Sequence, residues 1–137
     1  MPTEIISGLW IGNINDSFNT TLLQDNNITI FINCTTNYGF MDKLEGKRIR
    51  IPLSSNLDPK TDLVFLRDKK NNILDYIFKN IENHNILIYC YDGLNISPLI
   101  VSLFLMEYGK ISKDDIRSIL RSKNNKIILD IDLSIFS

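Results

Sequence analysis

Residues 86–106 constrain the fold more than any other part of the chain. Ile86-Leu87-Ile88-Tyr89 is an apolar run of strand length, and it passes directly into the loop Cys90-Tyr91-Asp92-Gly93-Leu94-Asn95-Ile96-Ser97. Ser97 suits the N-cap of a following helix, Pro98 its first position, and Gly109 its end. That helix is apolar nearly all round. Because neither element has a polar face, we expect both to be buried in the centre of a layered domain.

Further strands are predicted where β-branched and aromatic residues cluster between turn residues. The run at 28–34 is apolar almost throughout and predicts a buried strand, whereas 48–53 alternates polar and apolar residues and predicts a half-buried one. A loop should follow the second of these. The expected segments are a strand from Ile5 to Ile11, with a turn at Gly12-Asn13, strands Ile28–Cys34 and Arg48–Leu53, and the loop Ser54–Lys60.

Helices are predicted where apolar residues recur at helical spacing or where a capping residue precedes them. The tail from Lys126 to Phe136 is amphipathic, and its secondary structure is ambiguous. The expected helices are a short one capped by Asp16 or Ser17 and running through Leu23, a long one from Thr61 to about Glu82 with an interruption near Asn71-Asn72, and one opened by a capping box at Ser112–Asp115 and running through about Ser122.

Strands that alternate with helices predict an α/β domain with a mostly parallel central sheet of about four to five strands and helices on both faces. The chain has 137 residues, which fits a single domain over residues 1–137. Its 44% hydrophobic and 23% charged residues are ordinary for a soluble globular protein.

Charge and cysteine content exclude several classes of function. The formal net charge is −1, so no overall field favours nucleic acid or an anionic membrane. The longest apolar run, Pro98 to Met106, is too short to span a bilayer, and no signal segment is evident. Two cysteines are too few to staple a secreted scaffold. We therefore expect a cytoplasmic protein with reduced thiols, no cofactor and no metal site.

The loop that follows Tyr89 has the composition of an anion-binding site. A strand, a glycine-containing loop and a helix start bring backbone N–H groups together at one point, where the helix N-terminus adds partial positive charge. Cys90 lies at that point, and a cysteine there can act as a nucleophile. The bland alternative is that Cys90 is a small buried residue at a strand end.

In its order of motifs the chain resembles the dual-specificity branch of the protein tyrosine phosphatase superfamily, and its poxvirus members in particular. The family loop reads His-Cys-x-x-Gly-x-x-Arg-Ser/Thr, and Cys90, Gly93 and Ser97 match it. Other matching segments, in the same order as in the family, are Gly8-Leu9-Trp10-Ile11-Gly12-Asn13, Ile30 to Thr35, Ile51-Pro52-Leu53, Val101 to Met106 and Ile116-Arg117.

Three positions depart from the family pattern where chemistry depends on it. Tyr89 replaces the histidine, and Ile96 replaces the arginine that grips two phosphate oxygens. Ser55 stands where the resemblance places the aspartate general acid, and serine cannot protonate a leaving oxygen at neutral pH. Asp58 and Asp62 lie in or beside the same loop and remain candidate substitutes.

The remaining loop residues have roles that the resemblance implies. Cys90 is a vestigial nucleophile, Ser97 supplies the hydroxyl that supports its sulfur, and Tyr91, Asp92, Gly93, Leu94 and Asn95 form the binding loop. The Asp92 carboxylate should repel a phosphate. Tyr91 and Leu94 should point out of the loop into the substrate pocket, where they either fill it, the favoured interpretation, or make an apolar contact.

Residues outside the loop have ordinary structural interpretations. Cys34 is expected in the core and His84 in solvent before a strand. Lys60, Arg67, Arg117 and Arg121 are expected to be solvated charges, any of which could replace the missing arginine if the fold brought it near Cys90.

The sequence thus favours a catalytically inactive pseudophosphatase that acts as a protein-interaction module, with a host signalling or virion protein as the partner that viral relatives suggest. A slow, Cys90-dependent tyrosine/dual-specificity phosphatase is the alternative. Thiol chemistry is a third possibility, which the absence of an obvious resolving cysteine and the presence of Asp92 count against. Self-association as a homodimer through an apolar face, with the tail from Ile127 to Phe136 as the place to look, is a fourth.

Overall fold

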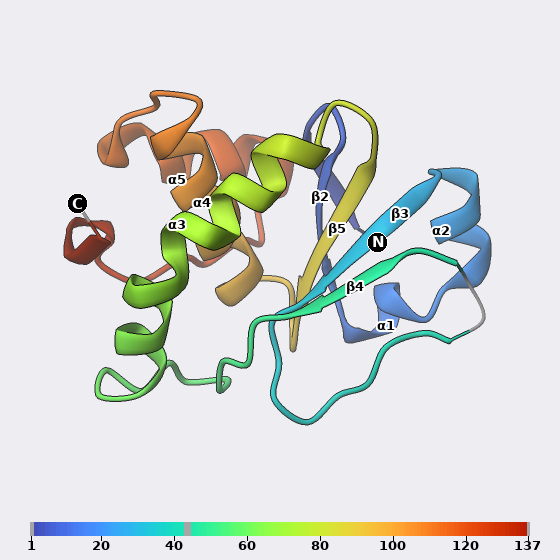
Figure 1. Cartoon of the computed structure of the whole chain (residues 1–137). Coiled ribbons are helices and arrows are strands. Elements are labelled where there is room, and N and C mark those ends of the chain that lie inside the picture. The colour runs from blue at the N-terminus through green and yellow to red at the C-terminus, as the bar shows by residue number, and fades with distance from the viewer. Residues whose placement is uncertain (1, 43–44, 137) are drawn as a thin grey trace.

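A five-stranded sheet forms the centre of the protein in a computed structural model that describes residues 2–42 and 45–136 (Figure 1). Met1 and Ser137, the ends of the predicted domain, lie outside the described residues. The first strand pairs antiparallel with the second, and every other pair is parallel, which confirms the predicted α/β class. Across the sheet the strands are β1 (Thr3–Ile6), β2 (Leu9–Asn13), β5 (Asn85–Cys90), β3 (Ile28–Asn33) and β4 (Lys47–Arg50).

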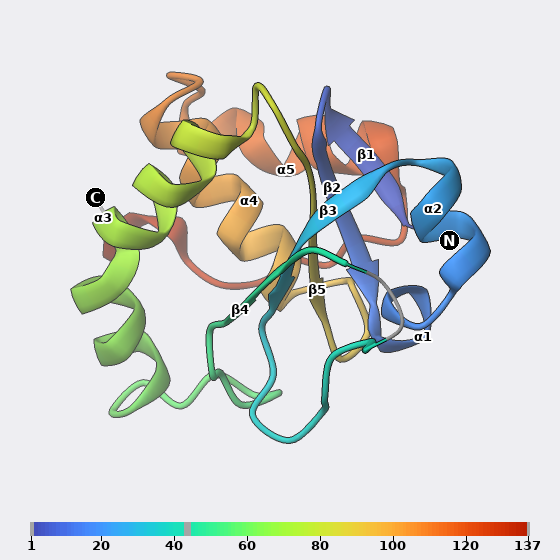
Figure 2. The same cartoon turned by 45° about the vertical axis from the view of Figure 1, so that its right-hand side comes forward.

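Helices cover both faces of the sheet, as Figures 1 and 2 show. The N-terminal helices pack on one face and the remaining helices on the other, so the strands that lie centrally are buried on both sides. The first group is α1 (Ile14–Ser17) and α2 (Thr20–Asp25); the second is α3 (Asp62–Asn80), α4 (Ile96–Glu107), α5 (Lys113–Lys123) and the 3₁₀ helix η1 (Leu133–Phe136).

Strand alternation divides the interior into two clusters. Ile86, Ile88 and Cys90 of β5 face the main core beside α3, α4 and α5, whereas Leu87 and Tyr89 face a smaller cluster on the side of α1 and α2. The β5 strand is therefore buried on both faces, as its apolar sequence predicts. It ends at the sheet centre with the Cys90 side chain turned toward α4.

The N-terminal strand prediction was wrong because Ser7-Gly8 interrupts the apolar run. Gly8 has φ +88°, and Ile6 pairs with Leu9 across the turn, so Ile5–Ile11 is a β1–β2 hairpin. A left-handed backbone at this point costs glycine little.

The single short helix predicted after the hairpin is in fact two helices with other caps. Asn13 caps α1 through a capping box with Asp16, whose carboxylate accepts the Asn13 N–H, and Asn19 caps α2. Ser17 lies inside the first helix and donates its hydroxyl to the Ile14 carbonyl. Asparagine competes well with aspartate and serine for this position, so the cap could not be chosen from composition.

Three further expectations about helices need correction. α3 runs without interruption through Asn71-Asn72, and α4 begins at Ile96, with Asn95 in the N-cap position, so Ser97 and Pro98 lie within its first turn. Ser112 does precede α5, but its hydroxyl bonds the Asp115 carboxylate and not a backbone N–H, so no capping box forms. The predicted end of α4 just before Gly109 is confirmed.

Strand β4 and the tail are also more irregular than the patterns suggested. β4 ends at Arg50, before Ile51-Pro52, since proline cannot donate to a ladder. Ile127, Leu129, Leu133 and Phe136 of the tail are buried in the main core, which removes the premise that the tail is an exposed apolar face. Within the described residues, no helix is long and apolar enough to cross a membrane.

Candidate active-site loop

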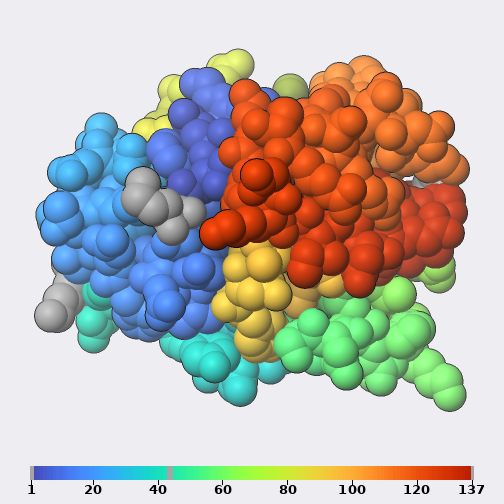
Figure 3. Space-filling model, turned by 180° about the vertical axis from the view of Figure 1, so that it is seen from behind, coloured from blue at the N-terminus to red at the C-terminus, as the bar shows by residue number. Residues whose placement is uncertain are grey.

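The parallel strands β2, β5 and β3 end at the same edge of the sheet, and residues 91–95 form the loop at that edge. Figure 3 shows the loop (golden yellow) reaching the surface between the blue N-terminal segment, the cyan segment after β3 and the green segment before α3. Tyr91, Leu94 and Asn95 are half-buried, Asp92 is exposed and Gly93 is buried. The loop therefore presents a mixed surface above a buried cysteine.

The sulfur of Cys90 lies inside a ring of hydrogen-bond donors. The Gly93 N–H lies 3.2 Å from it, the Ser97 N–H 3.3 Å and the Ser97 hydroxyl oxygen 3.2 Å. Cys90 itself has no exposed surface. The predicted meeting of cysteine, glycine and serine is thus present in the fold, at the N-terminus of a helix of 12 residues.

Gly93 is required by the way this loop packs against β2. Its φ is +73°, and a Cβ at this position would lie 3.0 Å from the carbonyl carbon and oxygen of Gly12. The Ser97 hydroxyl also lies 3.4 Å from the Gly12 oxygen. Gly12, which lies in β2 and not in the predicted turn, therefore packs directly against the loop.

Asp92 turns its carboxylate back onto the loop. One oxygen accepts the Leu94 N–H at 2.9 Å and lies 3.9 Å from the Cys90 sulfur. A backbone donor of an anion-binding loop is thus already engaged by an anion of the chain itself. The expected repulsion between this carboxylate and an incoming phosphate has a geometric basis, because both would use the same group.

Ile96, at the position of the family's arginine, is the first residue of α4 and is only 2% exposed. It belongs to the main core together with Cys90 and Leu99. Its side chain has no donor, so it offers nothing to an anion in the loop.

The side chain of Tyr91 points away from the loop toward the segments that follow β3 and β4. Its hydroxyl donates to the Leu53 carbonyl at 2.9 Å and accepts the Thr36 N–H at 3.3 Å, and its ring meets Tyr38 edge-on at 5.8 Å. Leu94 instead faces the opposite flank, where it lines a groove together with Lys123 and Lys126. The two residues predicted to fill one pocket thus diverge.

The loop that carries Ser55 is organised by Asp62. This carboxylate is 8% exposed and accepts hydrogen bonds from the Ser54 N–H, the Ser54 hydroxyl and the Asp58 N–H. Asp58 is exposed and accepts the Lys60 N–H at 2.8 Å. Ser55 lies exposed in the turn between Ser54 and Asp58. Asp62 therefore has a structural task that ties both of its oxygens to its own loop.

Of the three arginines considered as substitute cations, Arg67 and Arg121 are exposed, as expected, and Arg117 is half-buried, but all three are engaged by backbone carbonyls of the tail. Arg117 donates to the Leu129 and Ile131 carbonyls, and Arg121 donates to those of Ile127 and Ile128. Arg67 likewise donates to the Ile135 carbonyl. These side chains fix the C-terminal segment, a task that no local sequence pattern revealed.

The same segment reaches the loop. The Ile128 and Leu129 N–H groups both donate to the Leu94 carbonyl, at 2.7 and 3.2 Å, and the Asp130 N–H donates to the Asn95 side-chain oxygen at 3.2 Å. The outer turn of the loop is therefore held by the tail as well as by β2.

Cys34 is buried in the main core, as predicted, but it also neighbours Cys90. Its N–H donates to the Tyr89 carbonyl at 2.8 Å, and burial, with a contribution from Cys90, raises the pKa of its thiol well above the usual value. Cys34 therefore lies close enough to Cys90 to be influenced by it, and both cysteines are free thiols. His84 is half-buried, with its Nδ1 2.9 Å from the Thr29 hydroxyl. The part of the chain that the structure describes contains no cluster of metal-ligand side chains.

Comparison with protein families matches residues 9–134 to the catalytic domain of dual specificity phosphatases. The match covers most of the chain, and the chain belongs to this family. Comparison with curated protein sequences gives no significant match.

Solved phosphatase structures share the fold. A leucine rich repeat and phosphatase domain containing protein from Entamoeba histolytica superposes with a TM-score of 0.76 at 24% identity, over 98% of this chain and 85% of that one. The human tyrosine phosphatase-like serine/threonine/tyrosine-interacting protein superposes with a TM-score of 0.75 at 15% identity, over 98% of this chain and 90% of that one. The tyrosine phosphatase OH1 of Orf virus superposes with a TM-score of 0.66 at 14% identity, over 94% of this chain and 79% of that one.

Proposed function

We propose that this member of the dual specificity phosphatase family is a catalytically inactive pseudophosphatase that acts as a protein-interaction module. The observation that carries the proposal is Ile96, which is buried in the core at the position where the family has its phosphate-binding arginine. The sulfur cradle around Cys90 remains, but the cation that should grip the phosphate is missing from it.

Family chemistry gives the size of the expected defect. Losing one preorganised donor to the developing charge costs roughly 10²- to 10³-fold in rate, and a bidentate cation should cost at least as much. Losing a positioned general acid costs about 10²- to 10⁴-fold more, and Ser55 cannot replace it. Together these losses amount to roughly 10⁴- to 10⁷-fold in rate, so we expect no measurable Cys90-dependent turnover.

Asp92 adds to the defect at the level of binding. Its carboxylate occupies the Leu94 N–H and lies beside the Cys90 sulfur, so a phosphate in the loop must displace or approach this negative charge. A loop that neither attracts nor holds phosphate has little use in catalysis.

The proposed interaction role rests on comparison with a structural relative. The structural relative named as a serine/threonine/tyrosine-interacting protein is described as tyrosine phosphatase-like, which supports an interaction role for a chain with a degenerate loop. By the same resemblance, a host signalling or virion protein is the partner we propose for a viral member of the family.

A weakly active phosphatase is the second candidate, and two observations favour it. The N–H groups of Gly93 and Ser97 still point at the Cys90 sulfur. Lys123 and Lys126 line the same groove as the loop residues, and they could attract an anion to its flank.

Restoring the missing groups tests the proposal. The double variant Ile96→Arg with Ser55→Asp should hydrolyse a small aryl phosphate faster than the natural chain, and adding Cys90→Ser should abolish the gain. Because an arginine in place of Ile96 would be costly to bury, each variant's melting temperature is measured alongside. A folded double variant with no Cys90-dependent gain contradicts the account of the loop.

A further inference from the structure

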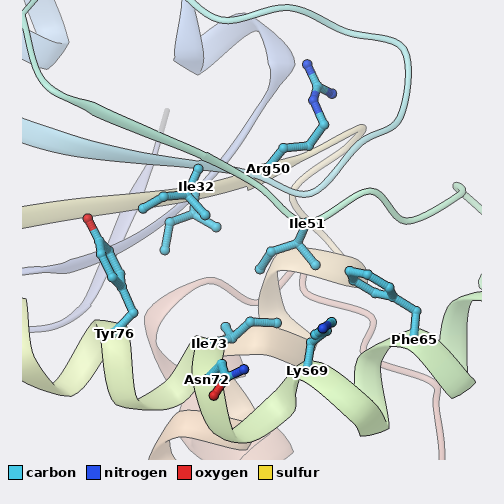
Figure 4. Close-up of a pocket in the computed structure, with 9 residues that line it drawn as sticks. Ile32, Arg50, Ile51, Phe65, Lys69, Asn72, Ile73 and Tyr76 are labelled. Atoms are coloured by element: carbon cyan, nitrogen blue, oxygen red, sulfur yellow. The ribbon is translucent and has the colours of Figure 1, made fainter.

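An apolar groove lies between the sheet edge and α3, away from the Cys90 loop (Figure 4). Ile32 and Ile51 project from the strand side, and α3 contributes Phe65, Ile73 and Tyr76, all drawn toward the same space. Burial raises the pKa of the Tyr76 hydroxyl, as expected beside such a lining. The groove has a volume of about 290 Å³, large enough for one or two side chains.

The groove exists because β4 is short and is the last strand of the sheet. β4 has 4 residues, whereas α3 has 19, so the helix extends along a strip that the sheet edge only partly covers. Ile49, Phe65, Ile73 and Tyr76 remain half-exposed as a result. An apolar strip of this kind gains free energy when another apolar surface covers it.

The charges at the groove have one sign. Lys69 of α3 lines it, and no carboxylate is among the described residues that do. On β4, strand alternation places the exposed Lys47 on the same face as Ile49. Lys69 contacts Asp68 at 3.7 Å, but both side chains are largely in solvent, so this pair is weak.

Arg50 contributes only its apolar stem. Its guanidinium turns away from the groove, as Figure 4 shows, and donates to the Thr35 and Tyr38 carbonyls. The chain's described C-terminal segment is also committed elsewhere, since Arg67 and Lys70 hold the Ile135 and Phe136 carbonyls. The described tail therefore does not fill the groove.

We propose that the groove binds a segment of a partner protein in which large apolar side chains are flanked by carboxylates. The apolar side chains enter between Ile49 and Ile73, and a flanking carboxylate pairs with Lys69. This inference deepens the proposed interaction function by naming the chemistry of the partner, and it does not require the Cys90 loop.

Three fluorescein-labelled peptides serve as probes: Gly-Glu-Leu-Phe-Glu-Gly, the same peptide with lysine in place of glutamate, and the same peptide with alanine in place of leucine and phenylalanine. The glutamate peptide should bind the full chain most tightly in fluorescence anisotropy, and the alanine peptide should lose at least tenfold in affinity. In methyl NMR spectra, the resonances that move should be those of Ile49, Ile51 and Ile73.

Matched variants on α3 test whether the peptides bind in the groove. Lys69→Glu should weaken the glutamate peptide about 3- to 10-fold and improve the lysine peptide, whereas Lys79→Glu, on the same helix outside the groove, should change neither. Tyr76→Ala should weaken binding, whereas Phe78→Ala, an exposed aromatic outside the groove, should not.

Three outcomes overturn the inference: no preference for the glutamate peptide, shifts confined to other methyl groups, or self-association that Lys69→Glu abolishes, which would make a second copy the occupant. Cys90→Ser should leave peptide affinity unchanged. Peptide binding and phosphatase turnover are separate readouts, so failure of this inference is distinguishable from failure of the proposed inactivity.

Discussion

The Asp92 carboxylate lies 3.9 Å from the sulfur of Cys90, and the same oxygen accepts the Leu94 N–H at 2.9 Å. The chain therefore carries its own anion on the loop that its family uses to hold a phosphate. This contact satisfies one of the loop's backbone donors from within the chain.

Removing this anion should improve oxyanion binding without creating an enzyme. Asp92→Ser should bind tungstate about tenfold more tightly than the natural chain in calorimetry, because a nearby like charge is lost. Asp92→Asn keeps an oxygen for the Leu94 N–H and should gain less. Asp114→Ser, an exposed change on α5, is the control and should behave like the natural chain. Equal affinities for the natural chain and Asp92→Ser would refute the interpretation of this contact.

Gly93→Ala should destabilise the fold by about 2–4 kcal/mol, because alanine is strained at φ +73° and its Cβ would press on the Gly12 carbonyl. Urea denaturation measures the change. Gly39→Ala is the matched control, since a Cβ there would meet nothing within 4 Å. If the two variants unfold at the same urea concentration, the packing of the loop against β2 is not as described.

Arg117 should prove necessary for the tail to stay docked. Arg117→Ala removes charged hydrogen bonds to the Leu129 and Ile131 carbonyls and should cost about 2–3 kcal/mol of stability. Arg117→Lys should recover only part of this, since lysine lacks the fork that reaches both carbonyls. Hydrogen exchange should accelerate at Leu129 and its neighbours. Lys113→Ala, at the exposed start of α5, should change neither stability nor exchange.

Tyr89 should make stability fall at high pH. Burial raises the pKa of its hydroxyl from 10.0 to about 12. The unfolded chain then loses this proton first, so the contribution is fully present below pH 10 and is lost as pH rises toward 12. It amounts to about 2–3 kcal/mol. In urea denaturation, Tyr89→Phe should lack this part of the decline. Parallel curves for the two proteins between pH 10 and 12 would contradict the assignment.

The central strands and the buried helix were predictable because their residues are apolar on every side. Ile28–Cys34 and Ile86–Tyr89 admit few other structures, and β3 and β5 lie there. The N-terminal hairpin was missed, because the two residues that form its turn lie inside one apolar run and only the positive φ of Gly8 separates the strands.

The site was predictable as far as local spacing determines it. Cys90, Gly93 and Ser97 meet because a strand, a tight loop and a helix follow one another directly. Contacts between distant residues could not be predicted from such spacing. Arg117 and Arg121 look like solvated helix charges until the tail is seen to cross them, and Cys34 becomes a neighbour of Cys90 only through the pairing of β3 with β5.

The measurement that tests the central claim most directly is phosphatase turnover by the natural chain, compared with Cys90→Ser, on a small aryl phosphate and a phosphotyrosine peptide. The account predicts that the two proteins give the same rate, equal to the background. Turnover by the natural chain that Cys90→Ser abolishes would contradict it, and would show that another cation and another acid serve the Cys90 loop.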